Sequence, residues 1–183
     1  MNIYFVRHGQ TEWNVLKKVQ GKADISLNKN GEIQALETAK MLEGKKIDLI
    51  ISSPLKRARQ TADLICQGRN IDIIIDKRIE ERDFGEFEGL KTSQFNFNEF
   101  WSYKANVDYD NAENIRDFFK RVYGFIEDIV NKYSDKNILI VSHGGVSIPF
   151  NCYFNGLPNI ECLLPLCLKN CEVATYKSFN KEN

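Results

Sequence analysis

The sequence predicts an α/β protein, a three-layer α/β/α sandwich around a mostly parallel central sheet. Apolar, β-branched runs typical of buried strands alternate along the chain with segments whose apolar residues recur at helical spacing. No repeat, low-complexity tract or interdomain linker interrupts this alternation. We therefore expect residues 1–183 to form a single domain.

The first half of the chain is expected to hold three strands and two helices. The strands are 3–6, 47–52 and 71–75, and the β-branched run of the third is typical of a strand covered on both faces. Capping residues at 28–31 precede a helix over about 32–42, with Ile33, Leu36 and Leu42 on one face. Pro54 disfavours helix at the residue before it, so the next helix runs from about 55 to 66.

The second half begins with an excursion from the sheet. Over about 84–111 the pattern gives way to glycines, charges and many aromatic residues, which predicts a small aromatic cap with a helix between 93 and 103. A helix over about 113–133 follows and has the strongest apolar periodicity of the chain. A strand at 138–142, a short helix at 146–154 and a last strand at 172–178 complete the prediction.

Composition and charge narrow the functional classes. The formal net charge is zero, which argues against a nucleic-acid or anionic-membrane partner. No apolar segment approaches the roughly 18 residues of a membrane span, and no secretory leader is recognisable, so we expect a cytoplasmic protein. The five cysteines lack CxxC spacing, which favours reduced structural thiols over a disulfide framework or a zinc site.

Both histidines of the chain directly follow predicted strands. Arg7, His8 and Gly9 come after the first strand, and His143 and Gly144 come after the strand at 138–142. Ligands of open α/β sheets bind at the carboxyl ends of strands. A glycine after each histidine allows close backbone approach and leaves an amide to donate to a phosphate oxygen. The two histidines therefore predict a ligand site.

Charged residues near these strand ends suggest what the ligand is. Arginine presents a planar fork of donors that matches phosphate oxygens, so Arg7 and Arg57 beside two imidazoles describe a pocket for a dianion. Taken singly, each residue has an ordinary interpretation: a structural histidine, a surface arginine on a helix, and Glu81 in a solvated loop. Only their combination favours a functional site.

Five segments carry a more specific signal, in a defined order. They are Arg7-His8-Gly9-Gln10-Thr11-Glu12-Trp13-Asn14; Gln20-Gly21 with Asp24, Leu27, Gly31 and Gln34-Ala35; Ser53-Pro54-Leu55-Lys56-Arg57-Ala58-Arg59-Gln60-Thr61-Ala62; Ile79-Glu80-Glu81-Arg82-Asp83-Phe84-Gly85-Glu86-Phe87-Glu88-Gly89; and Val141-Ser142-His143-Gly144-Gly145. Together they resemble the histidine phosphatase superfamily, the phosphoglycerate-mutase-like proteins, over residues 1–150. The small phosphatase branch, with the alpha-ribazole and broad-specificity phosphatases, is the most similar.

The resemblance implies a role for each residue. His8 would be the nucleophile that forms a phosphohistidine, with a carbonyl or side chain holding its other ring N–H. Arg7, Arg57 and His143 would surround the phosphoryl oxygens, and Glu81 would serve as general acid and then general base with a raised pKa. Further substrate contacts would come from Asn14, Gln20, Gly21 and Gly144. We expect no metal and no cofactor, because the spacing fits no common metal motif.

Three functions remain open at this stage. The first is a phosphomonoester hydrolase acting on a small phosphorylated metabolite. The second is a cofactor-dependent phosphoglycerate mutase, although the insertion and tail that help mutases retain the intermediate are short here. The third is a noncatalytic phospho-ligand binding module, whose usual mark would be loss of His8 or Glu81. The sequence decides neither the physiological substrate nor the oligomeric state.

Two features bear on the substrate. Many family phosphatases have Gly-Glu-Ser before the long helix, where this chain has Ala112-Glu113-Asn114. The aromatic residues of the excursion either line an apolar pocket over the phosphate or cover the edge of the sheet. The residues concerned are Phe95, Phe97, Phe100 and Trp101.

Overall fold

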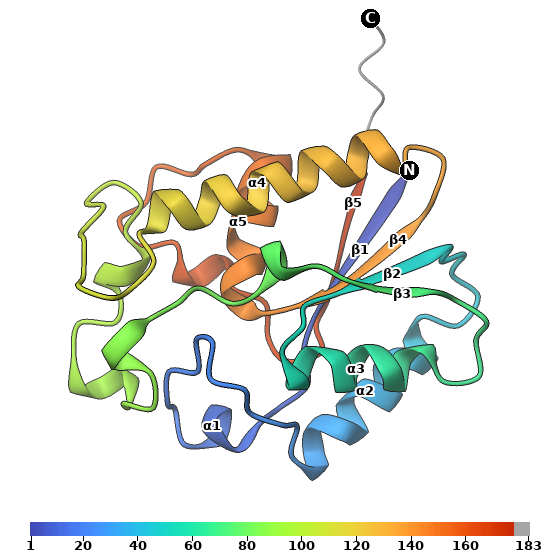
Figure 1. Ribbon diagram of the computed structural model, residues 1–183, viewed down its shortest axis with the longest axis horizontal. Coiled ribbons are helices and arrows are strands. Elements are labelled where there is room, and N and C mark those ends of the chain that lie inside the picture. The colour runs from blue at the N-terminus through green and yellow to red at the C-terminus, as the bar shows by residue number, and fades with distance from the viewer. Residues whose placement is uncertain (178–183) are drawn as a thin grey trace, which may run out of the picture.

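The computed structural model describes residues 1–177 and contains a five-stranded sheet of order β3-β2-β4-β1-β5 (Figure 1). β2 pairs in parallel with β3 and with β4, and β4 pairs in parallel with β1. β5 runs antiparallel to β1. The strands are β1 (Asn2–Arg7), β2 (Leu49–Ser52), β3 (Ile73–Ile75), β4 (Ile138–Ser142) and β5 (Val173–Lys177). The predicted α/β class with a mostly parallel sheet is confirmed; Ser178, which the prediction placed in the last strand, lies outside the described residues.

Helices cover both faces of the sheet (Figure 1). Helices α2 and α3 lie on one face, and α4 and α5 lie on the other. Alternate side chains of the strands point to opposite faces, so Val6 and Leu139 pack with α3 whereas Phe5 and Ile140 pack with α4 and α5. The helices are α1 (Glu12–Val15), α2 (Lys29–Met41), α3 (Lys56–Cys66), α4 (Ile115–Lys132) and α5 (Gly144–Asn155).

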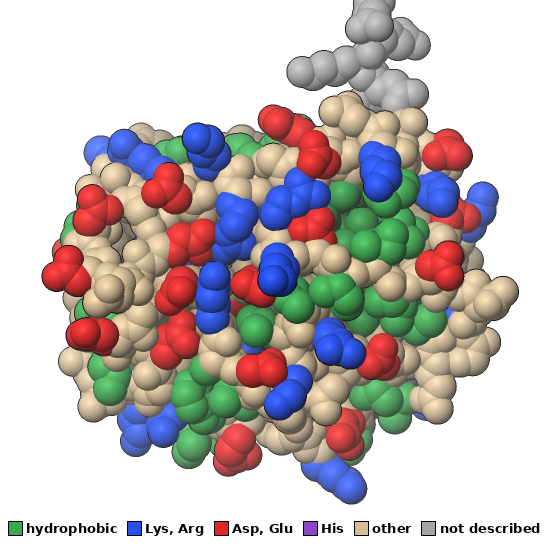
Figure 2. Space-filling model, in the orientation of Figure 1, with side chains coloured by type: hydrophobic (Ala, Val, Ile, Leu, Met, Phe, Trp, Pro, Cys, Tyr) green, Lys and Arg blue, Asp and Glu red, His purple; other side chains and the backbone are tan. Residues whose placement is uncertain are grey.

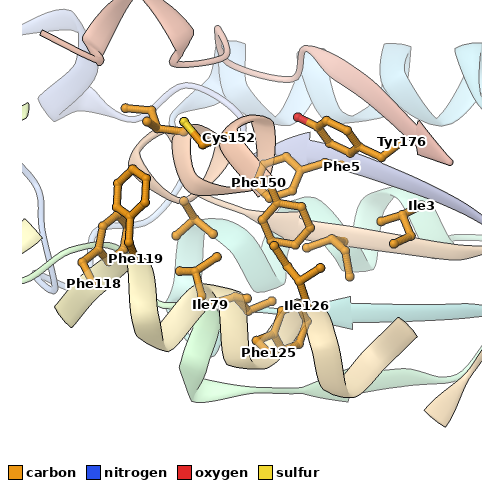
Figure 3. Close-up of a cluster of buried hydrophobic side chains, with 14 of the residues drawn as sticks. Ile3, Phe5, Ile79, Phe118, Phe119, Phe125, Ile126, Phe150, Cys152 and Tyr176 are labelled. Atoms are coloured by element: carbon orange, nitrogen blue, oxygen red, sulfur yellow. The ribbon is translucent and has the colours of Figure 1, made fainter. Parts of the chain in front are cut away.

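The larger core lies between the sheet and the helices α4 and α5 (Figure 3). Phe150 of α5 contacts Phe5 of β1 with ring centroids 4.8 Å apart. Phe125 of α4 packs against Phe150 with ring centroids 6.2 Å apart. Asn114 caps α4 by accepting a hydrogen bond from the backbone N–H of Arg116. The long helix is thus present, beginning two residues later than predicted because the cap stands at Asn114.

The predicted apolar face of α2 is wrong at two of its three residues, because only Leu42, the C-cap, is buried. Ile33 and Leu36 are 50% and 41% exposed, and the buried face is made of the small residues Gly31, Ala35 and Thr38. The cause is close backbone approach, because a Cβ on Gly31 would lie 2.1 Å from the carbonyl oxygen of Gln10. A face of small residues lets α2 lie directly against the segment that follows β1.

Two further predictions need correction. The strand β3 is not covered on both faces: it is one of the two edge strands, pairs only with β2, and leaves Ile75 46% exposed. The helix predicted between 93 and 103 is replaced by the short 3₁₀ turns Thr92–Gln94 and Glu99–Trp101. The aromatic side chains there, at 95, 97, 100 and 101, do not fall on one helical face, so a continuous helix would leave some of them exposed.

Charged side chains are interspersed on the surface. On the face shown in Figure 2, Lys and Arg alternate with Asp and Glu without a large region of one sign. Within residues 1–177, none of the helices has the length and apolar character needed to cross a membrane.

Candidate active site

The two histidines meet because their strands are neighbours. β1 and β4 pair in parallel with Arg7 opposite Ser142, so the next residue on each strand is a histidine. The backbone N–H of His8 donates to the carbonyl of Ser142 at 2.8 Å. The imidazole rings lie edge to face with centroids 5.3 Å apart. The sheet register therefore brings together side chains that are 135 residues apart in the sequence.

His8 is buried and held as a neutral imidazole with a defined tautomer. Its Nδ1 lies 2.7 Å from the carbonyl oxygen of Gly9, which only accepts hydrogen bonds, so the ring proton is on Nδ1. Its Nε2 accepts a hydrogen bond from Nε of Arg57 at 3.2 Å. Burial first, and then the positive charges of Arg57 and Arg7, keep the pKa of His8 well below its usual value. An unprotonated Nε2 is what a nucleophile requires.

Arg57 is completely buried at the start of α3 and organises the loop before it. Its Nη1 donates to the carbonyl of Ala23 and its Nη2 to the carbonyl of Gly21, both at 2.7 Å. Gly21 has a positive φ of 50°, and a Cβ there would collide with the carboxylate of Glu88. Burial lowers the pKa of Arg57 to about 10, so the side chain remains charged at neutral pH.

A pocket of about 300 Å³ opens at this edge of the sheet. The predicted site residues that line it are Arg7, His8, Asn14, Gln20, Gly21, Arg57, Glu81 and Gly144. His143 does not line the pocket but packs edge to face against the ring of His8. The structure thus brings together all the residues that the sequence singled out.

Arg7 and Gly144 lie in close contact at one side of the pocket. Arg7 donates from Nη1 to the carbonyl of Leu168 at 2.6 Å, and its buried Nε has no partner within residues 1–177. A Cβ on Gly144 would lie 2.6 Å from Sγ of Cys167 and 3.0 Å from Cζ of Arg7. Glycine at 144 is therefore needed for the guanidinium to lie where it does.

Glu81 approaches the pocket from the loop after β3. Its Oε2 accepts a hydrogen bond from the backbone N–H of Gly145, and its Oε1 accepts one from the N–H of Arg82, both at 2.9 Å. Burial raises the pKa of Glu81 above its usual value, against the opposing effect of these hydrogen bonds and of the charges of Arg57 and Arg7. A carboxyl with a raised pKa is suited to general acid catalysis.

Two polar side chains line the pocket, and among the described residues their amide nitrogens have no hydrogen-bond partner. The Oδ1 of Asn14 accepts from the backbone N–H of Thr11 at 3.0 Å and completes the capping box of α1. The Oε1 of Gln20 accepts from the hydroxyl of Thr11, also at 3.0 Å. Because the oxygens are engaged, the amide nitrogens are the groups left to donate to a ligand oxygen.

His143 is the more deeply buried imidazole. Its Nε2 lies 2.7 Å from Oγ of Ser53, and its Nδ1 has no partner within residues 1–177. Burial, followed by the charge of Arg57, holds the pKa of His143 well below its usual value. The ring is therefore neutral at pH 7, and its unpaired Nδ1 is buried.

The aromatic excursion divides between pocket and core. Phe84, Phe97 and Trp101 line the pocket, whereas Phe95 and Phe100 pack against each other with centroids 5.6 Å apart. The buried guanidinium of Arg82 lies 5.5 to 5.6 Å from the rings of Phe84, Phe100 and Trp101. The same guanidinium donates to the carbonyls of Glu113 and Phe100. One buried cation therefore holds the excursion together.

Several contributing residues were not assigned a role from the sequence. Gly145 and Ser53 lie inside quoted motifs, but only the geometry shows the first donating to Glu81 and the second touching His143. Asn170, whose Nδ2 donates to the carbonyl of His8 at 2.9 Å, carried no signal at all. Within residues 1–177 no group of three or more His, Cys, Asp or Glu side chains is arranged to hold a metal ion.

Comparison with known proteins identifies the family. The profile of the histidine phosphatase superfamily (branch 1) matches residues 3–182. The uncharacterized phosphatase PhoE of Bacillus subtilis (strain 168) is 35% identical over 178 residues, which cover 96% of this chain and 90% of PhoE.

Solved structures agree with this assignment. YhfR of Bacillus stearothermophilus has a TM-score of 0.89 at 28% identity, over 98% of this chain and 92% of its own. The alpha-ribazole phosphatase of Shigella flexneri has a TM-score of 0.83 at 27% identity, over 99% and 92%. This chain, with its paired strand-end histidines, buried arginine and acid loop, belongs to the histidine phosphatase superfamily.

Proposed function

We propose that this protein hydrolyses a small phosphomonoester through a phosphohistidine formed on His8. The observation that carries the proposal is the state of Nε2 of His8, a residue that lines the pocket: the nitrogen is unprotonated and accepts a hydrogen bond from Nε of Arg57 at 3.2 Å, which must be given up when Nε2 attacks phosphorus. A phosphoryl group that approaches this nitrogen comes next to the guanidinium of Arg57, a charged hydrogen-bond donor. That is the arrangement expected where negative charge develops in a transition state.

In the first step, Nε2 of His8 attacks phosphorus, the N–P bond forms, and the bond to the leaving oxygen breaks. Arg7 and Arg57 supply positive charge to the phosphoryl oxygens, and the unpaired Nε of Arg7 is a donor available for one of them. Asn14 and Gln20 offer their amide nitrogens, and His143, which does not line the pocket, packs against the ring of His8. The electrostatic groups are in position before substrate binds, which lowers the cost of reorganisation.

Glu81 completes the cycle by moving protons. Its raised pKa makes the protonated form more accessible than in an ordinary glutamate, and that form donates its proton to the leaving alkoxide. The resulting carboxylate then accepts a proton from the water that attacks phosphorus. The N–P bond breaks in this second step, its electron pair returns to Nε2 of His8, and inorganic phosphate is released. The balance requires no metal and no cofactor.

The substrate we propose is a small metabolite. A pocket of about 300 Å³ is at the lower limit of ligand sites, which favours a phosphate attached to a short chain or a single ring. Phe84, Phe97 and Trp101 provide an apolar wall for such a group. The likeness to an alpha-ribazole phosphatase makes ribazole phosphate, whose leaving group is larger than a single ring, a test of this size limit.

The direct test is chemical trapping of the intermediate. Wild-type protein and His8→Ala are mixed with a ³²P-labelled phosphomonoester and quenched in base, where phosphohistidine survives. We expect label on the wild-type protein and none on His8→Ala, whose turnover should fall below about a thousandth of wild type because the covalent route is lost. Residual activity above that level would contradict the nucleophile assignment.

The same experiment distinguishes the alternatives. A mutase transfers the phosphoryl group to another position of the substrate, so product analysis would show an isomer in place of free phosphate. A noncatalytic binding module would bind the phosphomonoester without turnover and without label on His8. We expect release of inorganic phosphate to dominate.

A further inference from the structure

Two lysines line the active-site pocket without a role in the phosphoryl chemistry. Lys17 and Lys18 directly follow α1 and its C-cap, Leu16. Within residues 1–177 neither ammonium group lies within ion-pair distance of a carboxylate, although Lys22, a few residues later, pairs with Glu80. Their charges are therefore uncompensated by the protein.

The backbone at Lys17 has an unfavourable conformation. Its φ of 54° is in the left-handed region, where glycine or asparagine is the usual residue after a helix. The conformation is held by hydrogen bonds on both sides: the N–H of Lys17 donates to Asn14 at 3.2 Å, and its carbonyl accepts from Thr92 at 3.0 Å. A long charged side chain is not needed for this turn, so its presence points to another use.

Lys18 is held in place by its neighbours. Its Nζ lies 5.5 Å from the ring centroid of Trp13, which itself lines the pocket. The backbone of this segment pairs with the loop after the acid motif, because Lys18 bridges to Lys91 and the N–H of Val19 donates to Leu90 at 2.9 Å. Both lysines thus stand on a backbone fixed from two sides.

The charge balance of the pocket shows what these lysines can bind. Four basic side chains line it, namely Arg7, Arg57, Lys17 and Lys18, whereas Glu81 is the single carboxylate among the described residues that line it. The whole chain has a formal net charge of zero, so the excess is local. A phosphomonoester dianion would balance the two arginines, and Glu81 serves as a proton donor. The two lysine charges remain for another group.

We propose that Lys17 and Lys18 form a subsite for a second anionic group, a carboxylate or a second phosphate, carried by the leaving group. The inference rests on the proposed function and narrows its substrate class to phosphorylated acids or bisphosphates. A phosphorylated neutral alcohol would leave both lysines without a partner. Ribazole phosphate, whose leaving group is uncharged, belongs to the class that this subsite disfavours.

A matched pair of substrates tests the subsite. 3-Phosphoglycerate and glycerol 3-phosphate share a three-carbon skeleton and differ in a carboxylate, and fructose 1,6-bisphosphate against fructose 6-phosphate tests a second phosphate. The wild-type protein should prefer the substrate with the extra anion in at least one pair. Each lysine replacement should raise KM for that substrate about fivefold, as expected for a partly exposed ion pair, and leave its neutral counterpart within about twofold.

The variants are chosen so that the fold is retained. Lys17→Asn removes the charge and keeps a residue that tolerates a positive φ, and Lys18→Gln keeps the length of the side chain. Lys120→Gln, an exposed lysine on α4 outside the pocket, is the control and should change neither KM. The preference for the additional anion should also weaken as salt is raised.

Turnover and binding are measured separately. Calorimetric titration of His8→Ala with both substrate pairs, with and without Lys17→Asn, reports the subsite without any chemistry. Equal affinity for both members of each pair, or equal weakening of both by Lys17→Asn, would overturn the subsite while leaving phosphatase activity on p-nitrophenyl phosphate intact. Absence of turnover on every phosphomonoester would instead overturn the proposed function, and a binding preference in the titration would still support the subsite.

Discussion

The replacement Gly145→Ala tests whether the position of Glu81 controls proton transfer. A Cβ on Gly145 would lie 2.1 Å from Oε1 of Glu81 and 2.6 Å from Cη2 of Trp101. Ordinary contact begins near 3.4 Å, so the carboxyl group must withdraw by about 1.3 Å. The hydrogen bond from the N–H of Gly145 to Oε2, now 2.9 Å long, would be strained or lost.

The magnitude follows from this displacement. A misplacement of about 1 Å costs roughly 10²-fold in rate, and the general acid itself contributes about 10² to 10⁴-fold. We therefore expect kcat/KM for an alkyl phosphate to fall about 100-fold in Gly145→Ala. Hydrolysis of p-nitrophenyl phosphate should fall much less, because nitrophenolate leaves with little protonation. Overpacking should lower the free energy of unfolding by about 1 to 3 kcal/mol.

Steady-state kinetics on both substrates, with urea unfolding in parallel, provides the assay. The control is Gly124→Ala in the middle of α4, where a new Cβ would meet no atom within 4 Å. It should leave activity unchanged and raise the free energy of unfolding by about 0.5 to 1 kcal/mol, because glycine weakens a helix interior. A folded Gly145→Ala protein whose alkyl phosphatase activity stays within threefold of wild type would refute the reasoning.

Three other predictions follow from the site. Glu81→Gln should slow alkyl phosphates far more than p-nitrophenyl phosphate, and equal losses on both would remove Glu81 from the acid role. Burial lowers the pKa of His8 and His143 below 6.5. As the pH falls through that value, these histidines take up protons in the unfolded chain but not in the folded protein. Each histidine should therefore reduce stability by about 1.4 kcal/mol per pH unit below it, whereas the raised pKa of Glu81 acts in the opposite direction. Urea titrations at pH 7, 6 and 5 measure the free energy of unfolding as a function of pH. His143→Gln should roughly halve the slope of this dependence, and an unchanged slope would contradict the prediction. Activity should survive excess chelator, and its loss would indicate a metal.

The elements of the sheet could be predicted because their signals are local. Apolar runs at β1, β2 and β4 and the amphipathic pattern of α4 depend on side chains within a few residues of one another. The candidate catalytic residues were predictable for a related reason, since each stands in a short motif: Arg7, His8 and His143 at strand ends, Arg57 at the start of a helix and Glu81 in a loop. Their roles in catalysis remain predictions for the experiments above.

The failures of prediction have a common physical cause. Periodicity indicated that Ile33 and Leu36 were buried, but the approach of the α2 backbone to Gln10 left room only for small residues. The β-branched composition of β3 suggested a covered strand, but composition does not show which strand stands at the edge of the sheet. In the aromatic excursion, a single buried arginine, Arg82, replaced local helical preference as the organising contact.

The sequence by itself therefore determined the α/β class, the strand ends that carry the histidines, and the chemical types gathered there, because all three follow from local pattern and motif. Only the tertiary structure decided which residues share the pocket. The β1–β4 register brings His143 to His8, and the loop at 170 reaches His8. These contacts join segments distant in sequence, and their geometry depends on backbone approach and sheet register.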